Sequence, residues 1–320
     1  MAINSFITNS NTIVCPTHLL ELAKNVKVKP RVAIADAANK IVMLSAKMGC
    51  DKKIMTPIFV GDTKKINAIA NEMNWDISEF QKINSKGEMD SANKASEICG
   101  AGNAEILMKG NVHSDVFIKA AIASKNNLRL RGRLVHMFYI TPPDGSKGVM
   151  ISDAAVNVEP NDNTKKQATK LVVEVLHNIG IEKPKIAFLS ASENLMESMP
   201  TTLTARKLSD WASENIKKAD FEGPLALDLI FSSEAAKIKG LSQSKVCGKV
   251  DGIIVPDIVS GNAIFKSLVY LGSGCAAGLV LGAKVPLLLT SRADPPAARL
   301  ASIALACISQ KNNPNFKNVN

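Results

Sequence analysis

The run Ser-Arg-Ala-Asp at positions 291–294 combines residue types that could bind phosphate. It follows an apolar segment that we expect to be a strand, and it opens the last segment with helical spacing. The amino end of a helix offers free N–H groups and the positive end of its dipole to an anion. Arg292 could hold two phosphate oxygens, and Ser291 could add a hydroxyl donor. The alternative, which the residues alone leave open, is that Ser291 or Asp294 only caps the helix.

Other polar candidates also follow apolar segments. Lys109 could contact an anion, although a solvated lysine is the simpler interpretation. His113 could be a general base, although a lone histidine near a strand end is more often structural. Asn262 could orient a ligand, or it could simply occupy a left-handed position in a tight turn. Glu222 and Asp228 could form an acid/base pair or serve in turns and caps.

Motifs for other kinds of site are missing or incomplete. The chain has no GxxxxGK[ST] sequence, so we expect no nucleotide site of the Walker type. The GxGxxxG sequence at 272–278 is one residue too long for the dinucleotide fingerprint and does not open a helix after a strand. The six cysteines form no CxxC pair, and the four histidines form no HExxH or HxH pattern. These spacings favour free thiols and predict no structural metal.

Composition and charge limit the class of protein. At roughly 150 residues per domain, the 320 residues suggest two domains. The 46% apolar and 21% charged residues indicate a globular protein and exclude a disordered or fibrous chain. The net charge of +10 comes from lysines spread along the chain and suits a small polyanion. With 4% aromatic residues and no basic tail, we expect no nucleic-acid partner.

The ends and the apolar segments predict a protein without a membrane anchor. The first ten residues lack the basic and long apolar regions of a secretory signal. The most apolar stretch, 275–283, ends at Lys284, well short of the roughly 20 residues that a membrane span needs. We therefore expect a cytoplasmic protein.

Strand and helix patterns alternate along the chain, which is typical of βαβ units and parallel sheets. The segments that read as strands are 31–36, 56–62, 104–110, 149–153, 185–190, 251–256 and 285–290. Those with helical spacing are 37–48, 64–72, 115–124, 164–179, 204–216 and 297–308. The turn-rich segment 141–148 indicates a domain boundary. The predicted fold is α/β with parallel-rich sheets in two domains, in which sites lie past the carboxyl ends of strands.

Several short segments, taken in order, resemble one family. They are 60–62, 107–113, 222–228, 234–240, 255–262 with Lys266, and 290–294. Their order and spacing are similar to those of the phosphate acetyltransferase/phosphate butyryltransferase family, from about Arg31 to Ile308. Any one motif is weak, but the ordered set is specific. The Ser-Arg-Ala-Asp run, with Met-Lys-Gly upstream, resembles the butyryltransferase branch more closely.

The resemblance implies an acyltransferase that interconverts acyl-CoA plus phosphate with acyl phosphate plus CoA. It implies an isocitrate/isopropylmalate dehydrogenase-like fold with an interdomain cleft. The first domain would comprise residues 1–141 and 289–320, and the second would comprise 142–288. It also implies a homodimer that uses no cofactor, because CoA is a substrate.

The resemblance also assigns residues. Ser291 and Arg292 match the family's phosphate-binding Ser-Arg, and Lys119 falls near a position where relatives often carry arginine. The acetyl branch has an aspartate, thought to act as base, where this chain has Ala298. Asp294 is the carboxylate nearby, so we take it as the base that accepts the CoA thiol proton. Lys109, His113, Lys119 and Asn262 are the further candidates for substrate binding.

Two readings from other classes stay open at this point. A dehydrogenase of the same broad fold would need a dinucleotide pocket, and a nicotinamide-binding assay would detect it. A non-catalytic relative would bind CoA or acyl phosphate without turnover, and Ala298 is the residue that favours it.

Overall fold

A computed structural model of the chain describes residues 13–289 and 294–310. The chain divides into two compact units. One is continuous in sequence and comprises residues 132–276; we call it the continuous unit. The other combines residues 13–131 with the chain from 277 onward; we call it the split unit. The sequence analysis expected domain boundaries after residues 141 and 288. These boundaries refer to domains that fold independently, and they stay a prediction.

The split unit is built on a mostly parallel sheet. Its strands are β1 (Arg31–Ala35), β2 (Thr56–Gly61), β3 (Lys82–Asn84), β4 (Ile106–Lys109), β11 (Leu287–Leu288) and most of β10 (Cys275–Leu281). Their order is β3-β2-β1-β4-β11-β10, and only β10 runs antiparallel to its neighbour β11. The central strands are almost wholly buried, which explains their unbroken apolar sequences. The five parallel strands all end at one edge of the sheet.

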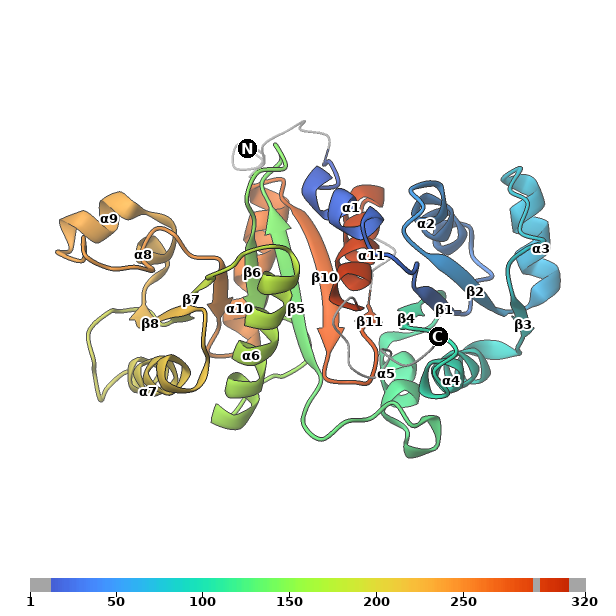
Figure 1. The fold of residues 1–320 in the computed structure, drawn as a ribbon. Helices are drawn as coiled ribbons and strands as arrows, with labels where there is room; N and C mark the ends of the chain where they lie inside the picture. The colour runs from blue at the N-terminus through green and yellow to red at the C-terminus, as the bar shows by residue number, and fades with distance from the viewer. Residues whose placement is uncertain (1–12, 290–293, 311–320) are drawn as a thin grey trace, which may run out of the picture. The chain divides into compact units, whose positions relative to one another are not determined.

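Helices cover both faces of this sheet. They are α1 (Thr17–Lys24), α2 (Lys40–Asp51), α3 (Thr63–Glu72), α4 (Gly87–Gly100), α5 (Ser114–Ile122), the short 3₁₀ helix η2 (Ser124–Asn126) and α11 (Pro296–Gln310). Figure 1 shows α2 and α11 together on one face, where α11 also contacts α1, and α4 and α5 on the other. Helix α11 is buried at every residue from 298 to 310, so it is a core helix of the unit.

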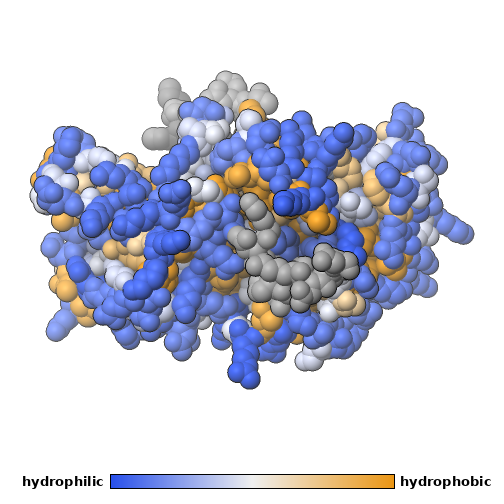
Figure 2. Space-filling view, viewed as in Figure 1, coloured by the Kyte–Doolittle hydropathy of each residue, from blue (hydrophilic) through white to orange (hydrophobic). Residues whose placement is uncertain are grey.

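The continuous unit contributes five strands. Its strands are β5 (Val135–Thr141), β6 (Val149–Ser152), β7 (Lys185–Leu189), β8 (Asp220–Leu225) and β9 (Gly252–Ile254). Their order is β5-β6-β9-β7-β8, with only β5 antiparallel to its neighbour. The helices are α6 (Asp162–Asn178), α7 (Pro200–Asn215), α8 (Leu227–Phe231), α9 (Ser233–Ile238), α10 (Ile258–Lys266) and the π-helical turn η3 (Ser267–Leu271). Hydrophilic side chains cover most of the face of this unit that Figure 2 shows.

The alternation of strands and helices predicted from the sequence is confirmed, and so is the α/β class. Several elements were not predicted, and three of them show why. β3 has only three residues, α4 has little hydrophobic periodicity, and β5 follows a segment rich in arginine. The strand expected over 285–290 is shorter than predicted, because only Leu287 and Leu288 enter the ladder with β4. Helix α2 starts at Lys40 because the Asn39 side chain caps it by accepting hydrogen bonds from two main-chain N–H groups.

Candidate active site

The carboxyl edge of the parallel strands in the split unit brings polar side chains together. Asp36 directly follows β1, in a left-handed backbone conformation with φ of 56°. The Asn111 side chain donates from Nδ2 to Asp36 Oδ2 at 3.3 Å, and Asn39 donates to Asn111 Oδ1 at 3.5 Å. Between them, Gly110 lies so close to the main chain that an added Cβ would collide with the carbonyl oxygens of Ala35 and Asp36. The ends of β1 and β4 are therefore joined tightly.

Lys109 is the last residue of β4 and lies at the same edge. It is 8% exposed, and its Nζ donates to the carbonyl oxygen of Val112 at 3.1 Å. β4 pairs with β11 in parallel, with Met108 opposite Leu288, so both strands lead to this edge. The sequence predicted Lys109 as an anion contact at a strand end. The structure places a buried ammonium group there, and its binding role stays a prediction.

His113 stands where the chain enters α5, at the N-cap position. Its main-chain N–H donates to Glu88 Oε2 at 2.8 Å, and its Nδ1 lies 2.8 Å from the same oxygen. These hydrogen bonds lower the pKa of the Glu88 carboxyl. His113 thus links the first turns of α4 and α5, an arrangement that sequence reasoning missed because the two residues are 25 positions apart.

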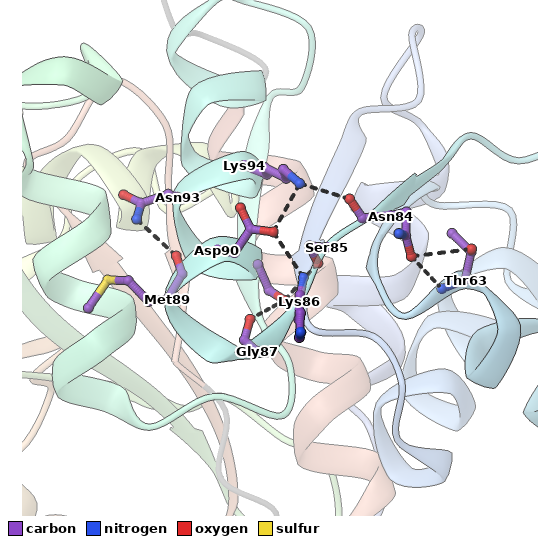
Figure 3. Close-up of polar contacts among 10 residues, drawn as sticks. Thr63, Asn84, Ser85, Lys86, Gly87, Met89, Asp90, Asn93 and Lys94 are labelled. Atoms are coloured by element: carbon purple, nitrogen blue, oxygen red, sulfur yellow. Dashed lines mark hydrogen bonds and ion pairs between the residues drawn. The ribbon is translucent and has the colours of Figure 1, made fainter.

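A polar network fixes the first turn of α4, which carries Glu88 (Figure 3). Asn84, at the end of β3, accepts from the Thr63 N–H at 3.3 Å through its side chain. Lys94 donates to the Asn84 carbonyl oxygen and to Asp90 Oδ2, both at 2.9 Å. The Lys86 N–H also donates to Asp90 Oδ2 at 2.9 Å. The polar groups at the end of β3 and the start of α4 thus bond to one another. We therefore assign this network a structural role, which is to hold the first turn of α4 in place.

The predicted phosphate-binding residues Ser291 and Arg292 lie outside the described residues. The structure resumes at Asp294, whose carbonyl oxygen accepts a hydrogen bond from Arg299 Nη1. Ala298 is 4% exposed within the first turn of α11. Lys119 lies on α5, where it pairs with Asp115 at 3.5 Å and is largely exposed. The binding and catalytic roles predicted for these residues are not tested by the structure.

Asn262 corrects one expectation. We expected Gly-Asn at 261–262 to form a tight turn, but both residues lie inside helix α10. The helix continues through them because Asp257 caps it, accepting from the Ser260 N–H at 2.8 Å. Gly261 is needed for close packing, since an added Cβ would lie 2.6 Å from the carbonyl oxygen of Asp153. The Asn262 side chain donates to the carbonyl oxygen of Ala154 at 3.1 Å, at the carboxyl end of β6.

Glu222 and Asp228 do not pair with each other. The Glu222 carboxylate accepts from the Ser244 hydroxyl, and Asp228 forms an ion pair with Lys239 at 3.0 Å. The hydrogen bond from Lys239 lowers the pKa of Asp228. Each carboxylate thus has its own partner, which fits the turn and cap alternative better than the acid/base pair.

His136 is a buried imidazole that the sequence analysis did not single out. It is 2% exposed, with its ring centroid 4.2 Å from that of Phe138. Its main-chain N–H donates to Asp153 Oδ2 at 3.1 Å, and in the described part of the chain its Nδ1 has no hydrogen-bond partner. Burial lowers its pKa to about 4, although the nearby Asp153 opposes this shift.

The buried His136 should make stability depend on pH. The unfolded chain binds a proton on this imidazole below about pH 6.5, whereas the folded chain binds it only near pH 4. The free energy of unfolding should therefore fall on acidification through this window, by about 3 kcal/mol at most. His136→Gln should show a smaller drop in Tm between pH 7 and pH 4.5 than the wild type. Identical drops in the two proteins would contradict the assignment.

Within residues 13–289 and 294–310, no group of three or more His, Cys, Asp or Glu side chains could hold a metal ion. Nor is any helix in that part of the chain long and apolar enough to cross a membrane. The fold and the strand edge thus define an α/β protein in which a buried lysine, two asparagine side chains and an aspartate lie at the ends of parallel strands.

Comparison with known proteins shows the family. Residues 88–307 match the family described as phosphate acetyl/butaryl transferase. A phosphate acetyltransferase from Rickettsia felis is 36% identical over 278 residues, covering 86% of this chain and 79% of the relative. A phosphate butyryltransferase from Clostridium acetobutylicum is 33% identical over 295 residues, covering 91% and 98%. The chain belongs to the phosphate acetyl/butyryl transferase family.

Solved structures agree. A branched-chain phosphotransacylase from Enterococcus faecalis is 29% identical and superposes with a TM-score of 0.77, covering 89% of this chain and 99% of that one. A 4-hydroxythreonine-4-phosphate dehydrogenase from Burkholderia phymatum, 13% identical and covering 88% of this chain and 99% of its own, has a TM-score of 0.56 and shares the fold alone. Both the family resemblance and the dehydrogenase-like fold inferred from the sequence are confirmed.

Proposed function

We propose that this protein transfers a short acyl group, from acetyl to butyryl, reversibly between CoA and inorganic phosphate. Family membership supports the acyltransferase class. The observation that carries the proposal is the shared strand edge: β4 ends there at the buried Lys109, and its parallel neighbour β11 precedes the Ser-Arg-Ala-Asp run in the sequence. Cations and a helix amino end at one strand edge suit phosphate.

The proposed reaction is a direct attack between two bound substrates. A phosphate oxygen attacks the thioester carbonyl and the C–S bond breaks. The departing CoA thiolate takes up a proton through Asp294, which receives it from the hydroxyl of the attacking phosphate. In the reverse direction the Asp294 carboxylate accepts the proton of the CoA thiol, whose ordinary pKa is about 8.5. Ser291 and Arg292 hold the phosphate, with Lys109 as a further cation. Correct placement of both substrates removes the need for a covalent intermediate.

The remaining candidates act in substrate binding in this proposal. Lys119 and His113 lie on or at the start of α5, which follows the edge formed by β4. We assign them to the anionic parts of acyl-CoA, and we assign Asn262, beside the end of β6, to orienting a substrate. The proposed reaction uses CoA as a substrate and needs no other cofactor.

The test is phosphate-dependent release of CoA thiol from acetyl-, propionyl- and butyryl-CoA, followed with a thiol reagent. Release that requires phosphate is expected, and its rates rank the acyl chains. Binding of CoA without release from any of the three would favour a non-catalytic relative, with Ala298 as the reason. Binding of a nicotinamide cofactor instead would favour a dehydrogenase. The likeness to a dehydrogenase is one of fold alone.

We also propose that the protein is a cytoplasmic homodimer that associates through α10 and η3. These segments are rich in apolar residues, yet Gly261 is the one buried residue in them. Val259 and Tyr270 are 74% and 64% exposed. An apolar surface of this kind is typical of an interface between subunits. The cytoplasmic location is checked by fractionation of the source cells, where recovery with membranes would contradict it.

Light scattering should therefore give twice the chain mass for the wild type. Val259→Glu with Tyr270→Glu should give a monomer, because two charges would be buried unpaired at the interface. Ile238→Glu, on α9, is a matched control at a 79% exposed apolar residue outside α10 and η3. A wild-type monomer at micromolar concentration, or a dimer unaffected by the double change, would contradict this interface.

A further inference from the structure

A cavity of about 280 Å³ lies within the continuous unit, at the carboxyl ends of β7 and β9. These strands are parallel neighbours in the order β6-β9-β7-β8. After β7 the chain continues through α7 to β8, whereas after β9 it continues through α10, which contacts β6 on the other side of β9. The chain thus leaves two neighbouring strands in opposite directions along the sheet. In open α/β sheets such a point forms a crevice in which ligands bind.

The inner wall of this cavity is apolar. It includes Phe188 and Leu189 from the end of β7, Val255 after β9, and Ala205 and Leu208 from α7. All five residues are buried. Their side chains match an aliphatic group on a ligand. The volume of about 280 Å³ is just below the range of about 300–1,000 Å³ that is usual for ligand pockets, so the ligand should be small.

The polar part of the lining supplies a cation. Lys165, in the first turn of α6, is half-buried at the cavity. Within residues 13–289 and 294–310, no carboxylate lies within 4.0 Å of its Nζ. Burial lowers the pKa of Lys165, while the charges of Asp162 and Asp257 oppose this shift. Partial burial of an ammonium group without such a partner costs free energy, and an anion in the cavity would offset this cost.

Two carboxylates also line the cavity. Asp257 uses its carboxylate to cap α10, accepting from the Ser260 N–H at 2.8 Å and from the Ser260 hydroxyl at 3.1 Å. Glu159 is exposed, so water and salt screen its charge. Thr204 faces the cavity from α7, and its hydroxyl bonds to no other side chain in the described part of the molecule. Lys165 and Thr204 therefore have donors left for a ligand.

We propose that this cavity binds a small anion with a short aliphatic tail, which is the chemistry shared by a short-chain carboxylate and its acyl phosphate. The anionic head bonds to Lys165 and Thr204, and the tail lies against the apolar wall. Every residue of this site belongs to the continuous unit, whereas Lys109 ends a strand of the split unit. The cavity is thus a binding site in addition to the strand edge, and its occupancy does not depend on acyl transfer.

The first test uses sodium butyrate as the probe. Binding is followed by saturation-transfer NMR and by the shift in Tm with butyrate concentration. A ligand of so few atoms should have a Kd of about 1 mM. 1-Butanol has a similar tail without the charge, and it should bind at least about 10-fold more weakly. Equal affinities for butanol and butyrate, or no saturation transfer to butyrate, would overturn the proposal.

Lys165→Met tests the cation. It should weaken butyrate binding about 10- to 100-fold, because it removes a charged hydrogen-bond donor. Without ligand its Tm should stay within about 2 °C of the wild type. Lys170→Met is the matched control, at an exposed lysine of the same helix whose Nζ lies 5.5 Å from the centroid of the Trp211 ring. Undiminished binding in Lys165→Met, or an equal loss in Lys170→Met, would contradict the site.

Ala205→Val tests the tail, because it narrows the apolar wall. It should weaken butyrate binding about 10-fold and acetate binding less, since acetate needs less of the cavity. Ala212→Val is the matched control, at a fully buried alanine of α7 that does not line the cavity. It should keep the wild-type affinity for butyrate. Equal losses of butyrate and acetate binding in Ala205→Val would argue against a tail in this cavity. If one of the two site variants does not fold, the other decides.

Butyryl phosphate, tested in the same way without CoA, separates the two sources of the ligand. Tighter binding than butyrate, lost in Lys165→Met, would identify the acyl phosphate, and weaker binding would identify the free acid. Failure of the proposed function gives a different result, since thiol release would then be absent while butyrate binding still depends on Lys165. Thiol release with phosphate but no binding of butyrate would overturn this site alone.

Discussion

Replacing Asp294 with asparagine is expected to lower kcat by about 10²- to 10⁴-fold, the range that a positioned general acid or base contributes. Asparagine keeps the shape of the side chain but cannot accept the proton of the CoA thiol. A free thiol with a pKa of about 8.5 is only a few per cent ionised at neutral pH, so the loss should be largest when CoA attacks acyl phosphate. KM for the substrates should change little, because the proposed role of the carboxylate is proton transfer during the reaction and not substrate binding.

The measurement is initial rates in both directions, with Tm recorded for each variant. Asp51→Asn is a suitable control, because Asp51 is an exposed carboxylate at the end of α2 whose partner is Lys47 at 2.8 Å. Near-normal kcat in Asp294→Asn, at unchanged Tm, would remove Asp294 from the mechanism. By the resemblance, the acetyl branch has an aspartate where this chain has Ala298. A group other than Asp294 would then have to act as the base.

The second large effect is expected from Arg292→Ala. Removing a charged donor from a phosphate or oxyanion site typically costs about 10²- to 10³-fold in rate. We expect this loss in kcat/KM for phosphate and for acyl phosphate, with a rise in their KM. Arg292→Lys should fall between alanine and the wild type, because lysine supplies a charge but not two parallel N–H donors.

The control for this series is Arg206→Ala, since Arg206 is an exposed arginine on α7. It should leave both KM values at the wild-type level. Thermal stability should be nearly the same in all these variants if Arg292 acts on the ligand. A parallel loss of Tm and activity in Arg292→Ala, or an unchanged dependence on phosphate, would argue that the residue serves the fold instead.

Part of the strand edge could be found from local sequence patterns. Lys109 and the run 291–294 each follow an apolar segment of strand length, and in parallel sheets such positions share an edge. β4 and β11 are indeed parallel neighbours, with Leu107 opposite Leu287. This reasoning needs only the order of strands and helices along the chain. The reasoning therefore identified positions that follow strands, but it did not predict which strands are neighbours in the sheet.

The contacts between those places could not be found in this way. Asn111 bonds to Asp36 over 75 positions, and Arg299 bonds to Ser45 over 254. Each partner is an ordinary polar residue in its own segment, and no local spacing marks the pair. Glu88 could not be linked to His113 because α4, with its weak hydrophobic periodicity, was not recognised as a helix. For Asn262 a local turn signal was misleading, since the cap at Asp257 and close packing against Asp153 extend the helix through it.

Local sequence patterns were enough to predict the α/β class, the resemblance to the family and the short run that we assign to phosphate. These depend on periodicity and on ordered motifs, which are properties of neighbouring residues. The packing of the elements, in contrast, is what buries Lys109, brings His113 to Glu88 and lets Arg299 bond both to Ser45 on α2 and to Asp294. The reason is physical: burial and hydrogen-bond partners are set by which elements pack together, and residues distant in sequence meet only after the sheet and its helices have formed.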